Sequence, residues 1–248
     1  MTVMIVTGAS RGIGAATARI AARSGWDVCV NYVNDRGAAE RVADEVRAAG
    51  RRALVVQADV ADEDAICRMF VAVDAGLGPV GALVNNAAVT GSGRRRVEQM
   101  TASAVNALLS ANITGAIVCA REAIRRMSTR HGGSGGVIVN VSSASSRLGA
   151  PNLWMDYAAS KGAIDTLTIG LAAEVAEEGI RVNAVRPGLI DTEIHASSGM
   201  PDRAARAARF IPMKRAGTAA EVAEAIVWLA SPAASYVSGA IVDVAGAR

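Results

Sequence analysis

The chain has 248 residues, of which 51% are hydrophobic and 20% charged. This length and composition are typical of one large α/β domain with a buried core, and they exclude a disordered protein. The net charge is only +3, the densest basic run is Arg94–Arg96, and just three Trp, three Tyr and two Phe are present. We expect that run to be a solvated loop, and we expect no nucleic-acid partner, because such a partner needs a clustered basic face.

Other protein classes are excluded by the scarcity of particular residues. Three cysteines lie far apart without a CxxC pair, and only two histidines are present, so we expect reduced thiols and no metal site. The N-terminus lacks the basic region and cleavage site of a secretory signal. The longest uncharged stretch, residues 99–120, contains several Ser, Thr and Asn and is judged too polar to span a membrane. The sequence therefore predicts a cytoplasmic protein without a membrane partner.

In chain order, short β-branched runs alternate with longer Ala-rich segments. Strands are expected at 3–6, 27–32, 53–59, 82–88, 136–143, 180–188 and 239–246, and helices at 13–21, 36–49, 62–75, 101–128, 157–178 and 219–230. This alternation predicts one Rossmann-type domain over residues 1–248, a doubly wound α/β fold with seven parallel strands and helices on both faces. Residues 193–217 break the rhythm with Gly and Pro, and we expect a substrate lid there.

The first strand leads directly into the sequence TGASRGIG, residues Thr7–Gly14. Its glycines, Gly8, Gly12 and Gly14, have the spacing G-x3-G-x-G, a variant of the dinucleotide fingerprint. Glycine permits a tight turn and a close approach of the backbone to a pyrophosphate, which free N–H groups at the following helix N-terminus can bind. The position after the first strand therefore favours a phosphate loop over an ordinary turn.

Tyr157 and Lys161 lie four residues apart in a predicted helix, so their side chains share a face. Lysine is rare in this chain, with two Lys against 24 Arg. A free phenol has a pKa near 10, too high for a base at neutral pH, and a nearby ammonium favours the phenolate. Lowering that pKa by about 3 units requires about 4 kcal/mol. The pair alone would also suit an amphipathic helix with an interfacial Tyr and a snorkelling Lys.

Several motifs in order resemble those of the short-chain dehydrogenase/reductase family, in its single-domain branch of 3-oxoacyl reductases and glucose dehydrogenases. They are TGASRGIG, AD at 58–59, NNAA at 85–88 (where the family usually has NNAG), NITG at 112–115, VSS at 141–143, YAASK at 157–161 and RPG at 186–188. The resemblance covers essentially the whole chain. It implies hydride transfer between a nicotinamide and a carbonyl or secondary alcohol, with Tyr157 as general acid/base, Lys161 holding the ribose, Ser143 bonding the substrate oxygen and Asn112 holding a water.

The same resemblance implies which residues contact the cofactor. Besides Tyr157 and Lys161 they are Gly8, Ser10, Arg11, Gly12, Ile13, Gly14, Asn31, Asp59, Val60, Asn86, Ala87, Pro187, Gly188, Ile190 and Thr192. The second strand ends in VNYVND, with no acidic residue at Asn31 or Tyr32 to accept hydrogen bonds from a ribose 2′-hydroxyl. Arg11 can reach a 2′-phosphate. We therefore expect NADP(H) to be preferred, with NAD(H) as a second cofactor that the site could accept.

Three alternatives concern the substrate, turnover and branch of the family. Relatives that reduce acyl-carrier-bound 3-ketones dock an acidic carrier on basic residues, whereas Glu177 and Glu178 would repel one. We favour a free small-molecule carbonyl or alcohol, and a 3-oxoacyl-thioester reductase stays the first alternative. A regulator that binds the cofactor without turnover is the second, and an epimerase or dehydratase of the extended branch, for which 248 residues leave little room, is the third. By family analogy we expect a homotetramer.

Overall fold

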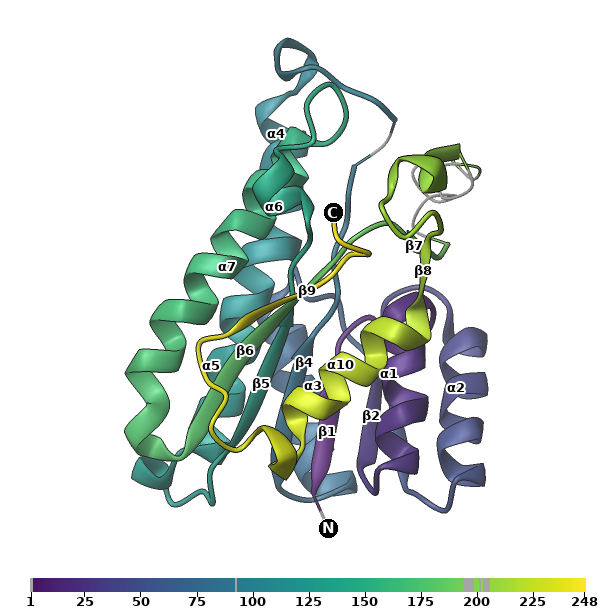
Figure 1. The fold of residues 1–248 in the computed structure, drawn as a ribbon. Helices are drawn as coiled ribbons and strands as arrows, with labels where there is room; N and C mark the ends of the chain where they lie inside the picture. The colour runs from purple at the N-terminus through teal and green to yellow at the C-terminus, as the bar shows by residue number, and fades with distance from the viewer. Residues whose placement is uncertain (1, 92, 194–198, 201, 203–205) are drawn as a thin grey trace.

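The computed structural model describes residues 2–91, 93–193, 199–200, 202 and 206–248. Seven parallel strands form its main sheet, in the order β3-β2-β1-β4-β5-β6-β9 (Figure 1). Their bounds are β1 Val3–Val6, β2 Asp27–Tyr32, β3 Ala53–Gln57, β4 Val80–Asn85, β5 Gly136–Val141, β6 Ile180–Pro187 and β9 Ile241–Val244. The predicted Rossmann-type sheet is therefore confirmed.

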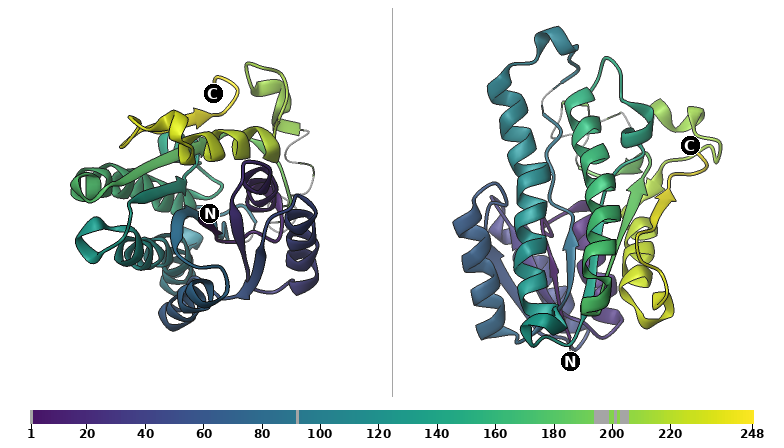
Figure 2. Two further views of the ribbon diagram at one scale, coloured as in Figure 1. Left: turned by 90° about the horizontal axis from the view of Figure 1, so that it is seen from below. Right: turned by 90° about the vertical axis from the view of Figure 1, so that its left-hand side faces the viewer.

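Helices cover both faces of the sheet (Figure 2). The helices α1 (Gly12–Arg23), α2 (Arg36–Ala48) and α10 (Ala219–Ala230) share one apolar core, and α3 (Glu63–Gly76), α5 (Gly115–Met127) and α7 (Met155–Val175) share the other. Alternate residues of a strand feed opposite cores: Met4 and Val6 of β1 face the first, whereas Val3 and Ile5 face the second. This explains why the strands are continuously apolar in sequence.

Short polar segments fix where several helices begin. The side chain of Asp35 accepts a hydrogen bond from the N–H of Ala38 and caps α2, and Asp62 caps α3 in the same way. Thr218 and Glu221 form a capping box at the start of α10. The observed helices consequently begin within two residues of their predicted starts.

The structure differs from the prediction where a helix is interrupted. The helix expected at 101–128 consists of α4 (Ala102–Leu109), a π-helical turn (Ser110–Thr114) and α5. Three short elements were not predicted, because two to four residues carry no periodicity: α6 (Ser145–Leu148), β7 (Ile190–Asp191) and β8 (Gly217–Thr218). Strands β7 and β8 pair with each other and so bring the ends of the expected lid together. Much of that lid, at 194–198, 201 and 203–205, lies outside the described residues.

The run Ala102–Met127 is more apolar than expected. It is long enough to cross a membrane, with a mean hydropathy of 1.5 in its most apolar window, so the judgement that this region is too polar was wrong on composition. One such helix is weak evidence for a membrane span, because a core helix passes the same test. Here its α5 part packs against α3 and the sheet.

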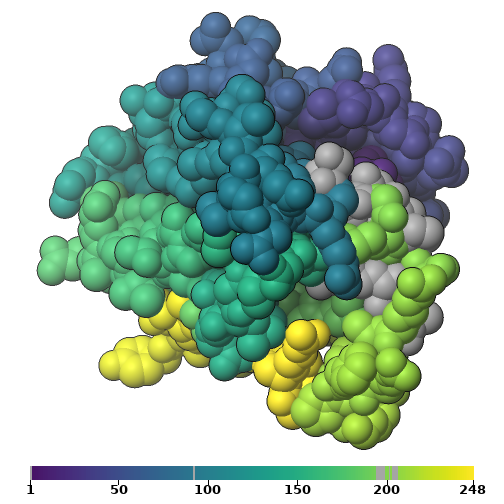
Figure 3. All heavy atoms as spheres, turned by 90° about the horizontal axis from the view of Figure 1, so that it is seen from above, coloured from purple at the N-terminus to yellow at the C-terminus, as the bar shows by residue number. Residues whose placement is uncertain are grey.

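The order of strands creates one place where a ligand fits between loops. From β1 the chain continues outward to β2 and β3, and it then returns to β4 on the other side of β1. In parallel sheets the crevice at this reversal, at the carboxyl ends of the strands, is the usual binding site. Figure 3 looks onto this end of the molecule, where segments near residues 100 and 150, residues 206–215 and the C-terminal segment gather.

Candidate active site

The loop after β1 has room for glycine alone at its centre. Gly8 and Gly12 have φ values of +62° and +55°, which disfavour side chains. A Cβ at Gly14 would lie 2.4 Å from the carbonyl oxygen of Gly8 and 2.5 Å from Nδ2 of Asn86. The residue before α1, Arg11, has an extended backbone and no side-chain cap. The first N–H groups of α1 are therefore available to an anion, as a pyrophosphate would require.

Asn31 supports this loop from below. Its Oδ1 accepts a hydrogen bond from the N–H of Gly8 at 3.0 Å, and its Nδ2 donates to the carbonyl oxygens of Val56 at 3.3 Å and Ala58 at 2.9 Å. The side chain is fully buried. Its amide is thus occupied by backbone groups of two segments, the glycine loop and the end of β3. The side chain therefore lies under the loop, and a contact of Asn31 with the cofactor stays a prediction.

Thr7 and Asn86 join the glycine loop to the segment after β4. The hydroxyl of Thr7 accepts hydrogen bonds from the N–H groups of Asn86 at 2.9 Å and Ala87 at 3.0 Å. In return, Nδ2 of Asn86 donates to the carbonyl oxygens of Thr7 at 2.7 Å and Gly8 at 3.1 Å. These bonds cross the reversal between β1 and β4. Thr7 was not assigned a role from the sequence, although it opens the glycine motif.

Tyr157 and Lys161 lie on the same side of α7, as their spacing predicts. Nζ of Lys161 is 5.5 Å from the centroid of the Tyr157 ring, and it donates a hydrogen bond to the carbonyl oxygen of Val141 at 2.7 Å. Lys161 is 3% exposed. Burial lowers the pKa of its amine to about 8, and the carboxylate of Asp165 acts in the opposite direction.

Ser143 follows β5 at the point where that strand contacts Lys161. The hydroxyl of Ser142 donates to the carbonyl oxygen of Lys161 at 3.1 Å, and Val141 accepts from its ammonium. Ser143 itself is buried, and its Oγ accepts a hydrogen bond from the N–H of Ser145 at 3.1 Å. The segment that carries Ser143 thus lies against α7 at Lys161.

Asn112 lies in the π-helical turn, where it connects two segments of the site. Its Oδ1 accepts from the N–H of Val89 at 2.8 Å, and its Nδ2 donates to the carbonyl oxygen of Val89 at 2.9 Å and to Oγ of Ser160 at 3.1 Å. The side chain is 2% exposed. Asn112 therefore braces the loop after β4 against α7, the helix of Tyr157.

Residues after β6 close the crevice from the other side. The N–H of Gly188 donates to the carbonyl oxygen of Val244, and a Cβ there would lie 2.7 Å from Cα of Ala245. A Cβ at Gly12 would lie 3.6 Å from Cβ of Thr192, so this segment reaches the glycine loop. The remaining expected contacts are exposed or partly exposed at the same edge (Ser10, Arg11, Ile13, Asp59, Ala87) or buried beneath it (Val60, Pro187, Ile190).

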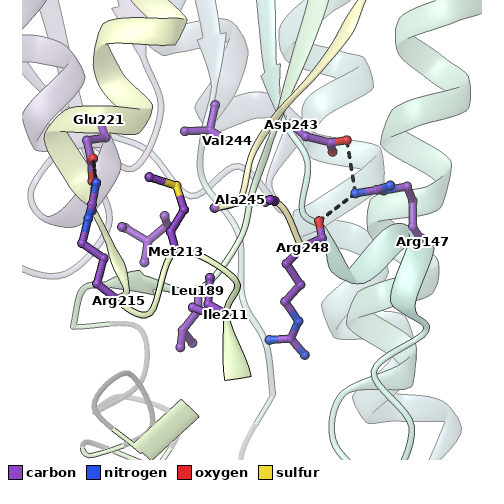
Figure 4. A pocket seen from close by; sticks show the side chains of 14 residues that line it. Arg147, Leu189, Ile211, Met213, Arg215, Glu221, Asp243, Val244, Ala245 and Arg248 are labelled. Carbon is purple, nitrogen blue, oxygen red and sulfur yellow. Dashed lines mark hydrogen bonds and ion pairs between the residues drawn. The ribbon is translucent and has the colours of Figure 1, made fainter. Parts of the chain in front are cut away.

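A cavity of about 510 Å³ opens beside the C-terminal segment (Figure 4). Apolar side chains such as Leu189, Ile211 and Val244 line it together with charged ones, and Arg147 bonds there to Asp243 and to the carbonyl oxygen of Arg248. Ser143, Tyr157 and Lys161 are not among its lining residues. The cavity adjoins the segment after β6 and is not the place where the expected catalytic groups meet.

Thiol and metal chemistry find little support within the described residues. No three His, Cys, Asp or Glu side chains are grouped there as metal ligands would be. Burial raises the pKa values of the Cys29 and Cys119 thiols to about 12, so neither is a thiolate at neutral pH.

Known proteins resemble this chain over its whole length. A family model described as enoyl-(acyl carrier protein) reductase matches residues 8–246. An uncharacterized oxidoreductase of Escherichia coli K12, YgfF, is 54% identical over 248 residues, which is all of both chains. The cis-4-hydroxycyclohexanecarboxylate dehydrogenase of Sinomonas cyclohexanicum is 41% identical over 98% of this chain and 95% of its own. A short-chain dehydrogenase from Burkholderia cenocepacia J2315, solved in complex with NADP, superposes with a TM-score of 0.89 at 32% identity, covering 99% of this chain and 96% of the other.

The sequence did not reveal what holds the start of α7. Nη2 of Arg95 forms an ion pair with Oδ2 of Asp156 at 2.7 Å, with side chains 16% and 2% exposed, so Arg95 is not the solvated residue expected. The indole N–H of Trp154 donates to the carbonyl oxygen of Gly93 at 3.0 Å, and its ring lies edge-on to that of Tyr157 at 6.3 Å. These contacts clamp the loop after β4 onto the first turn of α7. No local sequence pattern indicates these two contacts, because the partners in each are 61 residues apart.

Breaking the Arg95–Asp156 pair should destabilise the protein in a coupled way. Removing one partner leaves the other charge buried, so we expect Arg95→Met and Asp156→Asn each to lower the free energy of unfolding by about 3 kcal/mol. The double variant should lose clearly less than the sum. Urea denaturation measures all three, and Arg94→Met, at the exposed neighbour, is the control, expected within about 0.5 kcal/mol of the parent. Strictly additive losses would contradict the pairing.

Proposed function

The chain belongs to the short-chain dehydrogenase/reductase family and is an NAD(P)-dependent oxidoreductase acting on CH–OH and C=O groups, and we propose that Tyr157 is its general acid/base. The observation that carries this proposal is the buried ammonium of Lys161, 5.5 Å from the Tyr157 ring centroid. A positive charge at this distance stabilises the phenolate, the form that accepts a proton.

The residues present fit a dinucleotide. The packing at Gly14 leaves no room for a side chain, so the loop presents its backbone to the ligand. The uncapped start of α1 offers N–H groups to a pyrophosphate. The nicotinamide supplies or accepts the hydride when it is bound. We propose that the ammonium of Lys161 holds its ribose, while Ser143 donates a hydrogen bond to the substrate oxygen and so keeps the reacting carbon beside Tyr157.

Asn112 has a different part in this proposal. Its side-chain amide is occupied by Val89 and Ser160, so we assign it to bracing the site and leave any contact with water to the backbone of the π-helical turn. Proton transfer to Tyr157 then depends on Lys161 and its surroundings. A regulator without turnover would not need a buried amine beside a phenol, which is costly to keep away from water.

Tyr157→Phe should abolish most turnover and leave the cofactor bound. The variant keeps the ring and removes only the exchangeable proton, so we expect kcat to fall by about 10²- to 10⁴-fold. The dissociation constant for the cofactor, measured by fluorescence titration, should stay unchanged. Tyr236→Phe, at a fully exposed tyrosine, is the matched control. Turnover near that of the parent in Tyr157→Phe would remove the proposed role.

We further propose that NADP(H) is the preferred cofactor. The carboxylate nearest the end of β2 belongs to Asp35, and it accepts a hydrogen bond from the N–H of Ala38 at 2.8 Å as the cap of α2. The Asp35 carboxylate is therefore already engaged as the N-terminal cap of α2. Arg11, in the glycine loop, is exposed, and so is Arg36 after β2. Arg36 already lies 3.6 Å from the carboxylate of Glu40, so Arg11 is the guanidinium that we expect to favour a 2′-phosphate.

The cofactor preference is measured by comparing kcat/KM for NADPH and NADH. We expect the value for NADPH to be higher, and Arg11→Ala to lower it by about tenfold while changing the value for NADH little, because the lost bond is to the phosphate alone. Arg23→Ala, at the other end of α1, controls for loss of net charge. A higher kcat/KM for NADH in the parent protein would contradict the proposal.

For the substrate, we propose a free small-molecule carbonyl or secondary alcohol. The arginines at the end of α5, which a docking site for an acidic carrier protein would use, are already paired in this structure. Arg125 and Arg126 bond to Glu122 at 2.9 Å, and Arg130 approaches Glu178 at 3.3 Å. This surface is thus largely neutralised, which disfavours a docking site for an acidic partner.

Oxidation of NADPH with a panel of aldehydes, ketones and thioesters tests this choice. We expect kcat/KM for the best free ketone to exceed that for acetoacetyl carrier protein, because the arginines at the end of α5 are already paired with carboxylates. The acetoacetyl group on a small thiol separates the effect of the thioester from that of the carrier. A carrier-bound substrate used at least tenfold faster than both would favour the 3-oxoacyl-thioester alternative.

We also infer a single-domain cytoplasmic enzyme that assembles as a homotetramer. The outer side of α7 supports this assembly: Gly162 and Gly170 have no atoms near their missing side chains, and Ile169 is 57% exposed. Ile117 of α5 is 46% exposed. Small and apolar residues exposed on neighbouring helices favour close packing against a second copy.

A further inference from the structure

Lys161 carries a charge in a place where a charge is costly. Among the described residues, its ammonium bonds to the carbonyl oxygen of Val141 at 2.7 Å, from β5. The titratable and charged groups around it are Tyr157 and Asp165 on its own helix and, beyond Asp165, Arg186 of β6. Burial alone favours the neutral amine. Something must therefore offset burial if the amine is to stay protonated during catalysis.

Asp165 lies one turn further along the same face of α7. Its Oδ2 accepts hydrogen bonds from Nε and Nη2 of Arg186 at 3.0 and 2.9 Å, with side chains 11% and 18% exposed. Its Oδ1 is buried and has no hydrogen-bond partner among the described residues. A buried carboxylate oxygen without a partner is costly and calls for an explanation. Lys161 lies one turn earlier on the same face of α7, and the negative charge of Asp165 favours the charged form of its amine.

Arg186 fixes the position of the Asp165 carboxylate. It is in β6, directly before Pro187 and Gly188, and its side chain faces α7. The neighbouring strand places Asp243 in register with it, with Nη1 of Arg186 4.0 Å from Oδ1 of Asp243. Asp243 in turn binds Arg147 at 3.1 Å, at the wall of the cavity in Figure 4. The guanidinium of Arg186 thus lies between two carboxylates, and its two hydrogen bonds go to Asp165.

We propose that Asp165 is a positioning residue that supplies the counter-charge for the buried Lys161 ammonium, and that Arg186 fixes its carboxylate in place. The consequence for catalysis rests on the proposed role of Lys161 beside Tyr157. A merely structural role, in which the pair ties α7 to β6, predicts loss of stability when either partner is removed. The electrostatic role predicts in addition that the two removals act on Lys161 in opposite directions.

The chain allows this to be measured directly, because Lys161 and Lys214 are its two lysines. In protein labelled with ¹³C-lysine, the two side-chain Cε signals are followed against pH without cofactor or substrate. The exposed Lys214 is assigned by Lys214→Arg and serves as an internal control. In Asp165→Asn we expect the pKa of Lys161 to fall by about one unit, which lowers the ratio of charged to neutral amine about tenfold at a given pH.

Arg186→Gln is the matched variant. It removes the positive charge and leaves the carboxylate, so the pKa of Lys161 should rise or stay, and the double variant should lie between the two single ones. The inference is overturned if Lys161 titrates at the same pH in the parent and in Asp165→Asn. It is also overturned if both single variants lower its pKa alike, which would indicate a loosened structure.

Steady-state kinetics connect this result to turnover. The alkaline limb of the kcat/KM profile should move to lower pH in Asp165→Asn, with the dissociation constant for the cofactor little changed at pH 6.5, on the acid side of the amine's pKa of about 8. If Asp165→Asn changes the titration of Lys161 while Tyr157→Phe retains full turnover, the counter-charge stands and the proposed function fails. If Tyr157 is essential but the titration does not move, the counter-charge alone fails.

Discussion

Keeping a positive charge away from water is the costly feature on which this site depends. Lys161 is almost completely buried, and an uncompensated ammonium in such a place would lose its proton or destabilise the fold. The helix α7 solves this by its geometry. One turn before the amine it carries the phenol of Tyr157, and one turn after it the carboxylate of Asp165. The proposed acid/base, the buried amine and the proposed counter-charge thus share one helical face.

The parallel sheet brings the cofactor loop to this helix. All seven strands of the main sheet point the same way, so the loops that follow β1, β4, β5 and β6 meet at one edge. Below the glycine loop, the side chains of Asn31, Thr7 and Asn86 form hydrogen bonds with backbone groups of the loop and of the segment after β4. Those bonds fix the loop from beneath and leave the first amides of α1 unpaired by a cap. Rigidity below and free donors above are what a bound pyrophosphate needs.

Local features could be predicted from the sequence, and contacts between distant segments could not. The strands, the glycine loop and the shared face of Tyr157 and Lys161 follow from patterns within about ten residues, and all are observed. The ion pairs Arg95–Asp156 and Asp165–Arg186 join residues 61 and 21 positions apart, so no periodicity indicates them. That the Asn31 side chain bonds to the glycine loop could not be predicted either, because a strand end can face the loop or the ligand, and only the fold decides which.

A crystal structure with NADP(H) bound would show whether the dinucleotide meets Lys161 and Tyr157. We expect the pyrophosphate to lie at the start of α1 and the ammonium of Lys161 to lie about 3 Å from the hydroxyls of the nicotinamide ribose, with the Tyr157 hydroxyl on the same side of the ring. A nicotinamide held away from both side chains, for example over the cavity beside Asp243, would contradict this expectation and leave only a nucleotide-binding fold.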